Sequence, residues 1–254
     1  MGGATTKNAK ASVLTVVEID GSALKFKQDG GLFADNVEIA ILAMDETGKI
    51  REGVKDTAEL KLRPETHEAV VKNGVRMTRR LSLAPGRYQL RIGARESNGG
   101  LVGSVMYDLD VPDFSKGDLN MGGVLLTSAS AARVPTASPD PDFKEILPGS
   151  PTALREFPSG DELSLAVDIY DNRAFTAHRV EVRTTLTADN GTAVFSSRDE
   201  RKSEELKGAT GTFGHIAKVP LKDVAPGRYV LRVEAQSTLS NAAPAFREIE
   251  ITVK

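Results

Sequence analysis

The pentapeptide Ala-Pro-Gly-Arg-Tyr occurs twice in this sequence of 254 residues, at Ala84–Tyr88 and at Ala225–Tyr229. Each copy follows a short apolar run and opens an alternating segment, Tyr-Gln-Leu-Arg-Ile-Gly-Ala in the first and Tyr-Val-Leu-Arg-Val-Glu-Ala in the second. In both copies Pro presets φ for a turn and Gly accepts a positive φ. The repeat therefore predicts two copies of one β-domain.

Strict alternation of apolar and polar residues continues beyond each repeat. Over residues 87–95 the side chains expected to point inward are Tyr88, Leu90, Ile92 and Ala94. No stretch has helical periodicity longer than about two turns. Period-two strands at regular spacing, joined by Gly and Pro turns, are typical of antiparallel β-sandwiches. We expect two tandem immunoglobulin-like or fibronectin-III-like sandwiches.

The repeated tyrosine stands where the sixth strand of such a sandwich begins. This position predicts a tyrosine corner, in which the hydroxyl bonds back to the backbone of the preceding turn. The residues expected to build the two structural corners are Pro85, Gly86, Tyr88, Pro226, Gly227 and Tyr229.

The repeat divides the chain into a first domain over residues 1–114 and a second over residues 115–254. Residues 129–160 are rich in Pro and small side chains, which predicts an extended connecting segment with no core of its own. The first domain has no apolar segment before Val13, so its first strand is missing or is supplied by Gly3–Ala11, a poor strand. We expect the chain to be a piece of a longer protein.

Charge and composition argue against several partners. The net charge is −2 and the pI about 6.0, so no basic excess points to nucleic acid or to an anionic membrane. The chain has no cysteine, which excludes disulfides and thiolate metal sites. No apolar run approaches the roughly 20 residues that span a bilayer. The first eight residues have no apolar core of the kind a signal peptide needs.

No motif predicts a catalytic, metal or cofactor site. His67-Glu68 resembles the start of a zinc-protease helix, but Val71 stands where the second histidine is needed. His178 and His215 cluster with no other histidine in the sequence. The glycines at 208, 211 and 214 lack phosphate-loop spacing. A calcium site would need six to eight oxygens gathered from scattered acids. These acids are Asp140, Asp142, Asp161, Asp168 and Asp171.

Outward arginines on the strands after each repeat admit two interpretations, a polyanion site and cross-strand charge pairs. We favour pairing, because the next strand in each half carries outward acids, and such pairs contribute roughly 0.2–1 kcal/mol each. The arginines are Arg87, Arg91, Arg95, Arg228 and Arg232, and the acids are Asp108, Asp110, Glu248 and Glu250.

Two strands of the first domain carry apolar residues on both faces, whereas a sandwich strand normally wets one face. A second domain, an absent neighbour or another chain would have to cover the outer face, unless these are scattered surface hydrophobes. The predicted partner-binding residues are Leu14, Val16, Ala40, Leu42 and Met44. A missing first strand would also leave an open edge for oligomer formation.

Several blocks in order resemble the C-terminal region of bacterial VWFA-related proteins of the acidobacterial type. They are Leu-Ala-Pro-Gly-Arg-Tyr-Gln-Leu-Arg (83–91), Gly-Ser-Val-Met-Tyr-Asp-Leu-Asp-Val-Pro-Asp-Phe (103–114), Met-Gly-Gly-Val-Leu-Leu-Thr-Ser (121–128) and Phe-Pro-Ser-Gly-Asp-Glu-Leu (157–163). The resemblance implies a β-sandwich pair that follows a von Willebrand factor A domain, which this chain lacks. It also implies a parent protein in the periplasm or outside the cell, and it supplies no activity.

These observations predict a non-catalytic structural or protein-binding module of an exported bacterial protein, acting as a spacer, adhesion or assembly surface. A carbohydrate-binding module is the alternative, with Phe33, Phe175 and Phe213 as the available aromatic platforms. A subunit that exchanges strands in an extracellular assembly is another. An enzyme would need a constellation of distant residues that the sequence does not suggest. We expect no cofactor, no nucleic acid and no membrane insertion.

Overall fold

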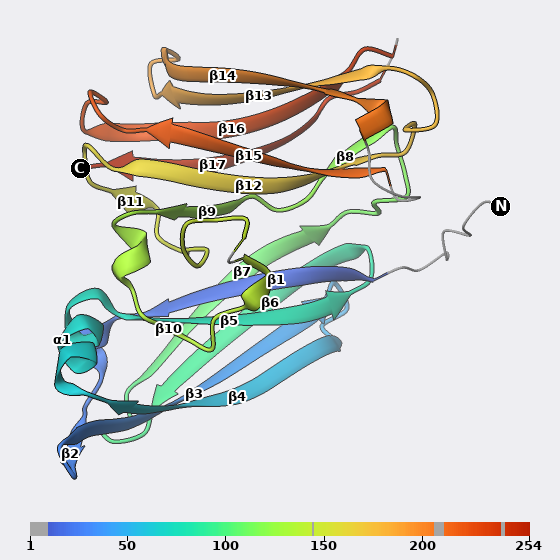
Figure 1. Cartoon of the computed structure of the whole chain (residues 1–254). Helices are drawn as coiled ribbons and strands as arrows, with labels where there is room; N and C mark the ends of the chain where they lie inside the picture. The colour runs from blue at the N-terminus through green and yellow to red at the C-terminus, as the bar shows by residue number, and fades with distance from the viewer. Residues whose placement is uncertain (1–9, 144, 206–210, 240–241) are drawn as a thin grey trace. The chain divides into compact units, whose positions relative to one another are not determined.

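The computed structural model describes residues 10–254 apart from residues 144, 206–210 and 240–241. The chain forms two compact units (Figure 1). Described residues up to Asp113, together with Arg133–Asp140, make one unit, and Phe114–Ala132 with Pro141–Lys254 make the other. Both are β-sandwiches of mainly antiparallel strands, which we call the first and the second sandwich.

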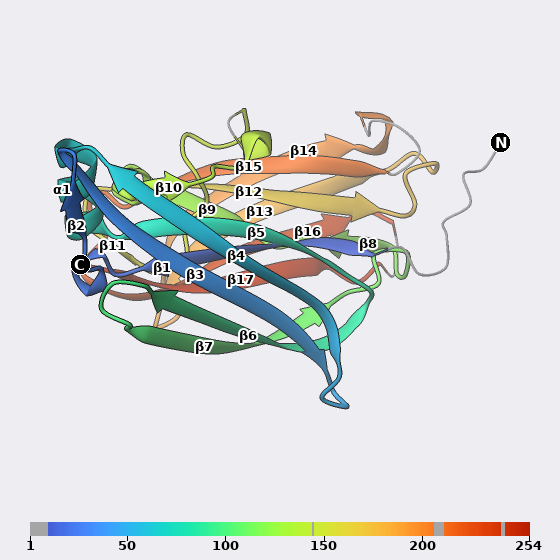
Figure 2. The same ribbon diagram turned by 90° about the horizontal axis from the view of Figure 1, so that it is seen from below.

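In the first sandwich a sheet of long strands faces a smaller one. The larger sheet has the order β4-β3-β6-β7, with the short β2 beside β3, as Figure 2 shows. The smaller sheet has the order β1-β5-β10. The strands are β1 (Ala11–Ile19), β2 (Lys27–Asp29), β3 (Leu32–Asp45), β4 (Ile50–Leu62), β5 (Val75–Leu83), β6 (Gly86–Glu96), β7 (Val102–Val111) and β10 (Thr136–Ala137).

The second sandwich repeats this arrangement with additional strands. One sheet has the order β14-β13-β16-β17-β11, and the other joins β15 to β12 and β12 to β8 and β9. The strands are β8 (Leu119–Met121), β9 (Leu125–Ser128), β11 (Glu156–Phe157), β12 (Glu162–Asp171), β13 (Arg179–Ala188), β14 (Ala193–Lys202), β15 (Thr212–Pro220), β16 (Gly227–Ser237) and β17 (Ala245–Val253). The two strands that precede β12 on that sheet, β8 and β9, are separated by a short break that contains Gly122 and Gly123.

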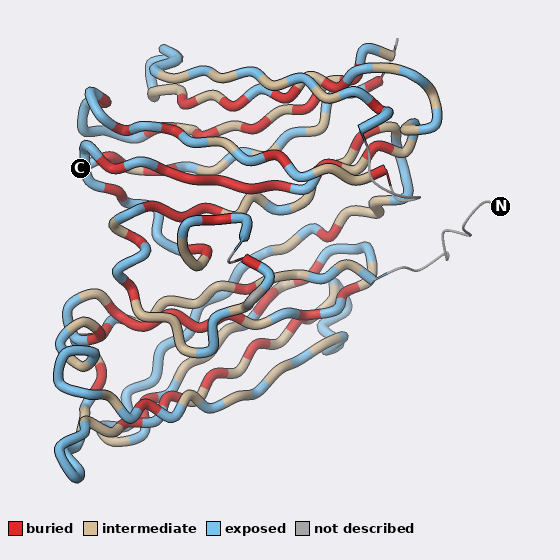
Figure 3. The backbone as a smooth tube through the Cα atoms, viewed as in Figure 1, coloured by how far each residue is buried: buried red, intermediate tan, exposed pale blue. Residues whose placement is uncertain are grey.

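Each sandwich has its own hydrophobic core. Ile39, Ile41, Met77 and Leu90 lie in the core of the first sandwich, and a separate cluster of buried residues fills the second. Burial alternates along β3, β13 and β16, where red segments alternate with paler ones in Figure 3. The all-β sandwich class predicted from period-two alternation is confirmed.

The two repeated turns have the same geometry. The Tyr88 hydroxyl donates to the carbonyl of Ala84 at 2.9 Å, and the Tyr229 hydroxyl donates to the carbonyl of Ala225 at 2.7 Å. Both rings are buried. Each tyrosine therefore fixes the turn that carries the chain from one sheet of its sandwich to the other.

One α-helix interrupts the first sandwich, although the sequence has no helical periodicity longer than about two turns. Helix α1 (Pro64–Asn73) begins with proline at its first position, ends at Gly74 with φ 87°, and buries Val70. Pro suits a first helical position and Gly a left-handed C-terminal cap. With one buried residue, α1 gives too weak an apolar stripe for periodicity to reveal. It is the one α-helix among the described residues, and none is long and apolar enough to cross a bilayer.

The connecting segment is more ordered than its composition predicts. Thr136 and Ala137 form β10, which pairs in parallel with Arg76 and Met77 of β5, and the backbone N–H of Arg76 donates to the carbonyl of Pro135 at 2.8 Å. Two short 3-10 helices lie in this segment, η2 (Ala131–Arg133) and η3 (Pro141–Phe143). Two more lie elsewhere: η1 (Gly21–Ala23) follows β1, and η4 (Ser203–Glu205) lies between β14 and β15. The expectation of a segment with no core of its own does not hold, because Phe143, Leu147 and Phe157 are all buried.

Candidate functional site

Among the described residues, exposed large apolar side chains gather on β7, at the edge of the larger sheet of the first sandwich. Five large side chains of this strand and the residue before it are 55–67% exposed. We call them the β7 strip; they are Leu101, Val102, Val105, Met106 and Tyr107. A contiguous exposed group of this kind marks an interaction site more often than scattered hydrophobes do.

Both faces of the strip are open, as the pairing of β6 with β7 shows. Val105 and Tyr107 stand opposite the inward residues Ile92 and Leu90, so they point toward the interior of the sandwich. Val102 and Met106 alternate with them and point outward. Val105 and Tyr107 are 62 and 61% exposed although they point inward. The described part of the smaller sheet therefore does not cover this end of β7.

The position of β7 adds an unpaired edge to this exposed strip. Among the described residues β7 pairs with β6 alone, so its other edge presents free backbone N–H and C=O groups. Natural edge strands are usually protected by Pro, by Lys or by bulges. Residues 101–107 contain none of these, and their only charged neighbours on the strand are Asp108 and Asp110. This edge can bind an additional strand.

The five partner-binding residues predicted from the sequence lie on two different sheets. Leu14 and Val16 are on the outer face of β1, whereas Ala40, Leu42 and Met44 are on the outer face of β3. The structure therefore does not bring them together on one surface. All five are half-buried.

Within the β3 group, Leu42 leans over its neighbour Gly53 on β4. A Cβ atom added at Gly53 would lie 2.9 Å from the Leu42 Cδ2. This apolar outer face is thus partly used by contacts within its own sheet.

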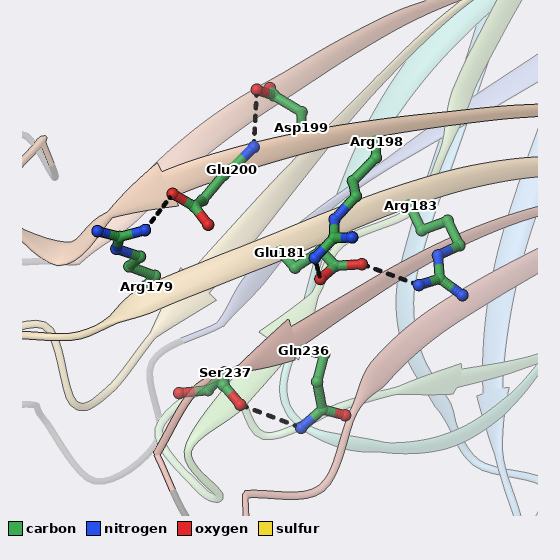
Figure 4. A network of polar contacts seen from close by, with 8 residues as sticks. All are labelled: Arg179, Glu181, Arg183, Arg198, Asp199, Glu200, Gln236 and Ser237. Atoms are coloured by element: carbon green, nitrogen blue, oxygen red, sulfur yellow. Dashed lines mark hydrogen bonds and ion pairs between the residues drawn. The ribbon is translucent and has the colours of Figure 1, made fainter.

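The corresponding strand of the second sandwich carries a charged outer face. Figure 4 shows Glu181 of β13 between two arginines, Arg183 at 2.9 Å and Arg198 of the adjacent β14. Two residues earlier on β13, Arg179 pairs with Glu200 of β14 at 3.0 Å. Apolar outer positions are therefore a feature of the first sandwich and not of the fold.

The outward arginines after each repeat are engaged with acids in the second sandwich. Arg232 pairs with Glu248 on β17 at 2.7 Å, its register partner, and its guanidinium lies 3.9 Å from the Phe246 ring centroid. Arg228 pairs instead with Asp189 of the β13–β14 hairpin at 3.0 Å.

In the first sandwich, Arg87 is the register partner of Asp110, and Arg91 donates to Gln89 at 3.0 Å. Arg91 and Arg95 stand opposite Met106 and Val102 instead of acids, so the predicted cross-strand charge pairing does not describe these two arginines.

The histidines and aspartates weighed above lie apart. His67 on α1 stacks on Phe33 at 3.8 Å, and His215 accepts or donates a bond with Thr184 at 3.1 Å. Burial lowers the pKa of His215. No group of three or more potential metal ligands occurs in the described part of the chain.

Three of the five acids considered for calcium likewise have separate contacts. Asp140 accepts from Arg80 at 2.8 Å in the first sandwich, and Asp161 accepts from the Ser130 hydroxyl at 2.5 Å in the second. Asp171 lies 3.0 Å from the Nε2 of His178. Of the glycine series, residue 208 lies outside the described residues.

A buried pair of carboxyl groups in the first sandwich escaped the sequence analysis. Asp35 accepts from the backbone of Lys25 and Asn36, and Glu96 accepts from the backbone of Asn98 and Gly99. Burial, helped by the charge of Glu96, raises the pKa of Asp35. Burial opposes ionisation of Glu96, but the N–H donors outweigh it and lower its pKa.

The same loop is held by the Asn98 side chain. Its amide donates to the carbonyls of Lys25 at 2.8 Å and Ala34 at 3.1 Å. The carboxyl pair thus fastens the β6–β7 loop to β3, and it sits just before the exposed end of β7.

Sequence reasoning missed the β7 strip, although a signal was present. Residues 101–107 read Leu-Val-Gly-Ser-Val-Met-Tyr, with apolar side chains at both odd and even positions. The test for two apolar faces that singled out residues 13–19 and 37–45 applies equally well here. What sequence could not give is the absence of a covering strand, because that depends on pairing between distant segments.

Comparison with known proteins gives only distant likenesses. No family model matches the sequence, and no curated protein does. Among solved structures, the C-terminal domain of wzt is similar over 55% of this chain and 75% of its own length, with 10% identity and a TM-score of 0.36.

Two larger enzymes contain similar regions. Bacteroides uniformis beta-glucuronidase 2 matches 96% of this chain at 7% identity and a TM-score of 0.35, and red sea bream transglutaminase matches 97% at 9% identity and a TM-score of 0.29. This chain spans 26% of the former and 31% of the latter. Likenesses this distant say nothing about activity.

Proposed function

We propose that this chain is a non-catalytic structural and protein-binding module whose contact surface is the β7 strip of the first sandwich. The observation that carries the proposal is the exposure of five large apolar side chains along a strand that pairs on one edge alone in the described part of the chain. Exposed apolar area on an edge favours association, because burying it releases roughly 25 cal/mol per Å². The second sandwich, with its charged outer strand, serves as a stiff support.

The resemblance to VWFA-related proteins supports a further part of the proposal. We place the parent protein among exported bacterial proteins, in the periplasm or outside the cell. In that setting two tandem sandwiches act as a spacer that presents the strip to a protein partner.

A displayed library of random peptides, panned on the full chain, tests protein binding without a known partner. We expect selected peptides to lose affinity at least about tenfold when Val105 and Met106 are both changed to lysine, since an unpaired charge placed in an apolar contact costs more than about 1.4 kcal/mol.

The matched control is Ile216→Lys, which changes a residue of β15 that is 55% exposed in the second sandwich. Binders that respond to Ile216→Lys as strongly as to the strip variants, or that ignore the strip altogether, would overturn the proposal.

Carbohydrate binding is the second candidate, and one observation favours it. Phe175, in the loop after β12, is 85% exposed, as an aromatic platform for a sugar must be. Phe33 stacks on His67 and Phe213 packs against the core of the second sandwich, so neither offers a free ring. A glycan array probed with the full chain and with Phe175→Ala separates the two candidates, because only sugar binding would depend on Phe175.

A further inference from the structure

We call the side of a sandwich between β12 and β17, or between their counterparts β1 and β7, its seam. In the second sandwich the seam is closed. Strands β8 and β9 pair with β12 along the edge that faces away from β15, with Met121 opposite Ile169 and Leu126 opposite Leu165. The same strand β8 packs across the seam against β17, where the Arg247 guanidinium donates to the carbonyl of Met121 at 2.6 Å.

The two tyrosine corners allow the same positions to be located in the first sandwich. Counting from Tyr229, Val233 stands opposite Arg247; counting equally from Tyr88, Ile92 stands opposite Val105. Val105 is therefore the counterpart of Arg247, which bonds to β8. Strand β1 pairs with β5 as β12 pairs with β15, so β1 is the counterpart of β12.

The corresponding seam of the first sandwich is open in the described part of the chain. There β1 pairs with β5 alone, and β7 pairs with β6 alone. Val105 and Tyr107, which point into the seam, are 62 and 61% exposed, whereas the core residues Met121 and Leu126 that fill the second seam are 1 and 2% exposed. The first sandwich thus presents an unpaired β1 edge beside an uncovered apolar row on β7.

We propose that this seam accepts an extended strand from a partner polypeptide, which pairs with β1 and covers Val105 and Tyr107. The proposal rests on the protein-binding function above and specifies its partner. Backbone hydrogen bonds to β1 supply part of the affinity, and apolar side chains at alternate positions supply the rest.

The second sandwich shows what chemistry the seam takes. Its closing segment, Leu119–Ser128, directs Leu119, Met121 and Leu126 into the core and runs antiparallel to β12. The nine residues before Lys10 read Met-Gly-Gly-Ala-Thr-Thr-Lys-Asn-Ala, which has no alternating row of large apolar side chains. The partner strand is therefore one with large apolar residues at every second position, antiparallel to β1.

A synthetic peptide with the sequence of Leu119–Ser128, added to the full chain, tests the proposal directly. We expect it to bind and to slow hydrogen exchange in β1 and β7. The same peptide with serine in place of Leu119, Met121 and Leu126 serves as the control and should not bind.

Val105 and Ile216 supply matched variants, since they are 62 and 55% exposed and Ile216 lies on β15 of the second sandwich, outside the β7 strip. Val105→Lys should weaken peptide binding at least about tenfold, because the charge would be buried in the seam. Ile216→Lys should leave it within about twofold, as expected for a charge added at an exposed position outside the strip. Equal losses in both variants, or protection of β4 instead of β1, would overturn the proposal.

Linking the peptide covalently to the chain tests closure of the seam even if the free peptide binds weakly. Joining the Leu119–Ser128 sequence to Ala11 through a short Gly-Ser linker makes closure intramolecular, at an effective concentration in the millimolar range. We expect the melting temperature to rise by about 4–8 °C, as for a gain near 1 kcal/mol in a domain of this size, and Val105→Lys to abolish the rise.

If the melting temperature of the linked version does not rise and the free peptide does not bind, the proposal that the seam accepts a strand is overturned. If library peptides still depend on Met106 in that case, the protein-binding function stands while the strand-accepting seam does not. If the library also yields nothing that depends on the strip, both fail.

Discussion

Strands β7 and β17 occupy the same place in the two sandwiches and differ in what covers them. Val253 and Ile251 of β17 are buried, and Val111 and Leu109 of β7 are covered at the equivalent end. Farther along the strands, Arg247 reaches a neighbouring strand whereas Val105 faces solvent. The difference lies in the closing segments β8, β9 and β11, which have no described counterpart in the first sandwich. A core strand becomes a binding surface when its neighbour is absent.

Opening the second seam should give the largest effect. Met121→Ala removes a 1% exposed side chain from the closing strand, and we expect a loss of about 2–5 kcal/mol in the free energy of unfolding. Urea unfolding measures the loss, and hydrogen exchange should become faster in β12. Val194→Ala, at a 43% exposed position on β14, should cost less than about 0.5 kcal/mol. A loss for Met121→Ala no larger than the control would mean that β8 does not support the core.

The tyrosine corners test whether the two halves are equivalent where they look alike. Tyr88→Phe and Tyr229→Phe each remove one donor and leave a turn carbonyl without its bond, so each should cost about 1–2 kcal/mol. Thermal unfolding of the two variants should give similar losses. Clearly unequal losses would show that the repeated turn supports the two sandwiches differently.

The buried carboxyl pair should give the first sandwich a pH dependence of its own. Asp35 has a raised pKa in the folded chain, so its favourable contribution is fully present below its unfolded pKa and is lost as pH rises through the folded pKa. Glu96 has a lowered pKa, so its contribution is present above its unfolded pKa and is lost as pH falls through the folded pKa.

The free energy of unfolding of Asp35→Asn should therefore increase relative to that of the wild type as pH rises from about 4 to about 7, whatever constant cost the substitution has. Urea unfolding at several pH values measures the difference between the two curves. Curves that stay parallel over this range would contradict the assigned direction for Asp35.

The charged outer face of β13 should matter least for stability. Glu181 is partly exposed and bridges Arg183 and Arg198, and exposed ion pairs contribute about 0–1 kcal/mol. Glu181→Gln should thus shift the free energy of unfolding by no more than about 1 kcal/mol, less at high salt. Denaturant titration at two salt concentrations checks this. A larger, salt-independent loss would assign the network a packing role.

Sequence reasoning reached the fold class because period-two alternation and a repeated turn are local signals. The Ala-Pro-Gly-Arg-Tyr copies define their strands within a few residues. Helix α1 was out of reach, since it buries Val70 alone. The strip left a signal in the sequence, because residues 101–107 carry apolar side chains at both odd and even positions. The open seam could not be predicted, because the exposure of Val105 is decided by whether a segment distant in sequence pairs with β1.

The placement of β10 has a consequence for how the molecule is made. The chain builds most of one sandwich, enters the second with Phe114–Ala132, returns with Arg133–Asp140 to add a strand beside β5, and then finishes the second. No single cut separates the two sandwiches with all their strands. During synthesis, the first sandwich can acquire its last strand only after the opening strands of the second have left the ribosome, so the two halves cannot fold in strict succession.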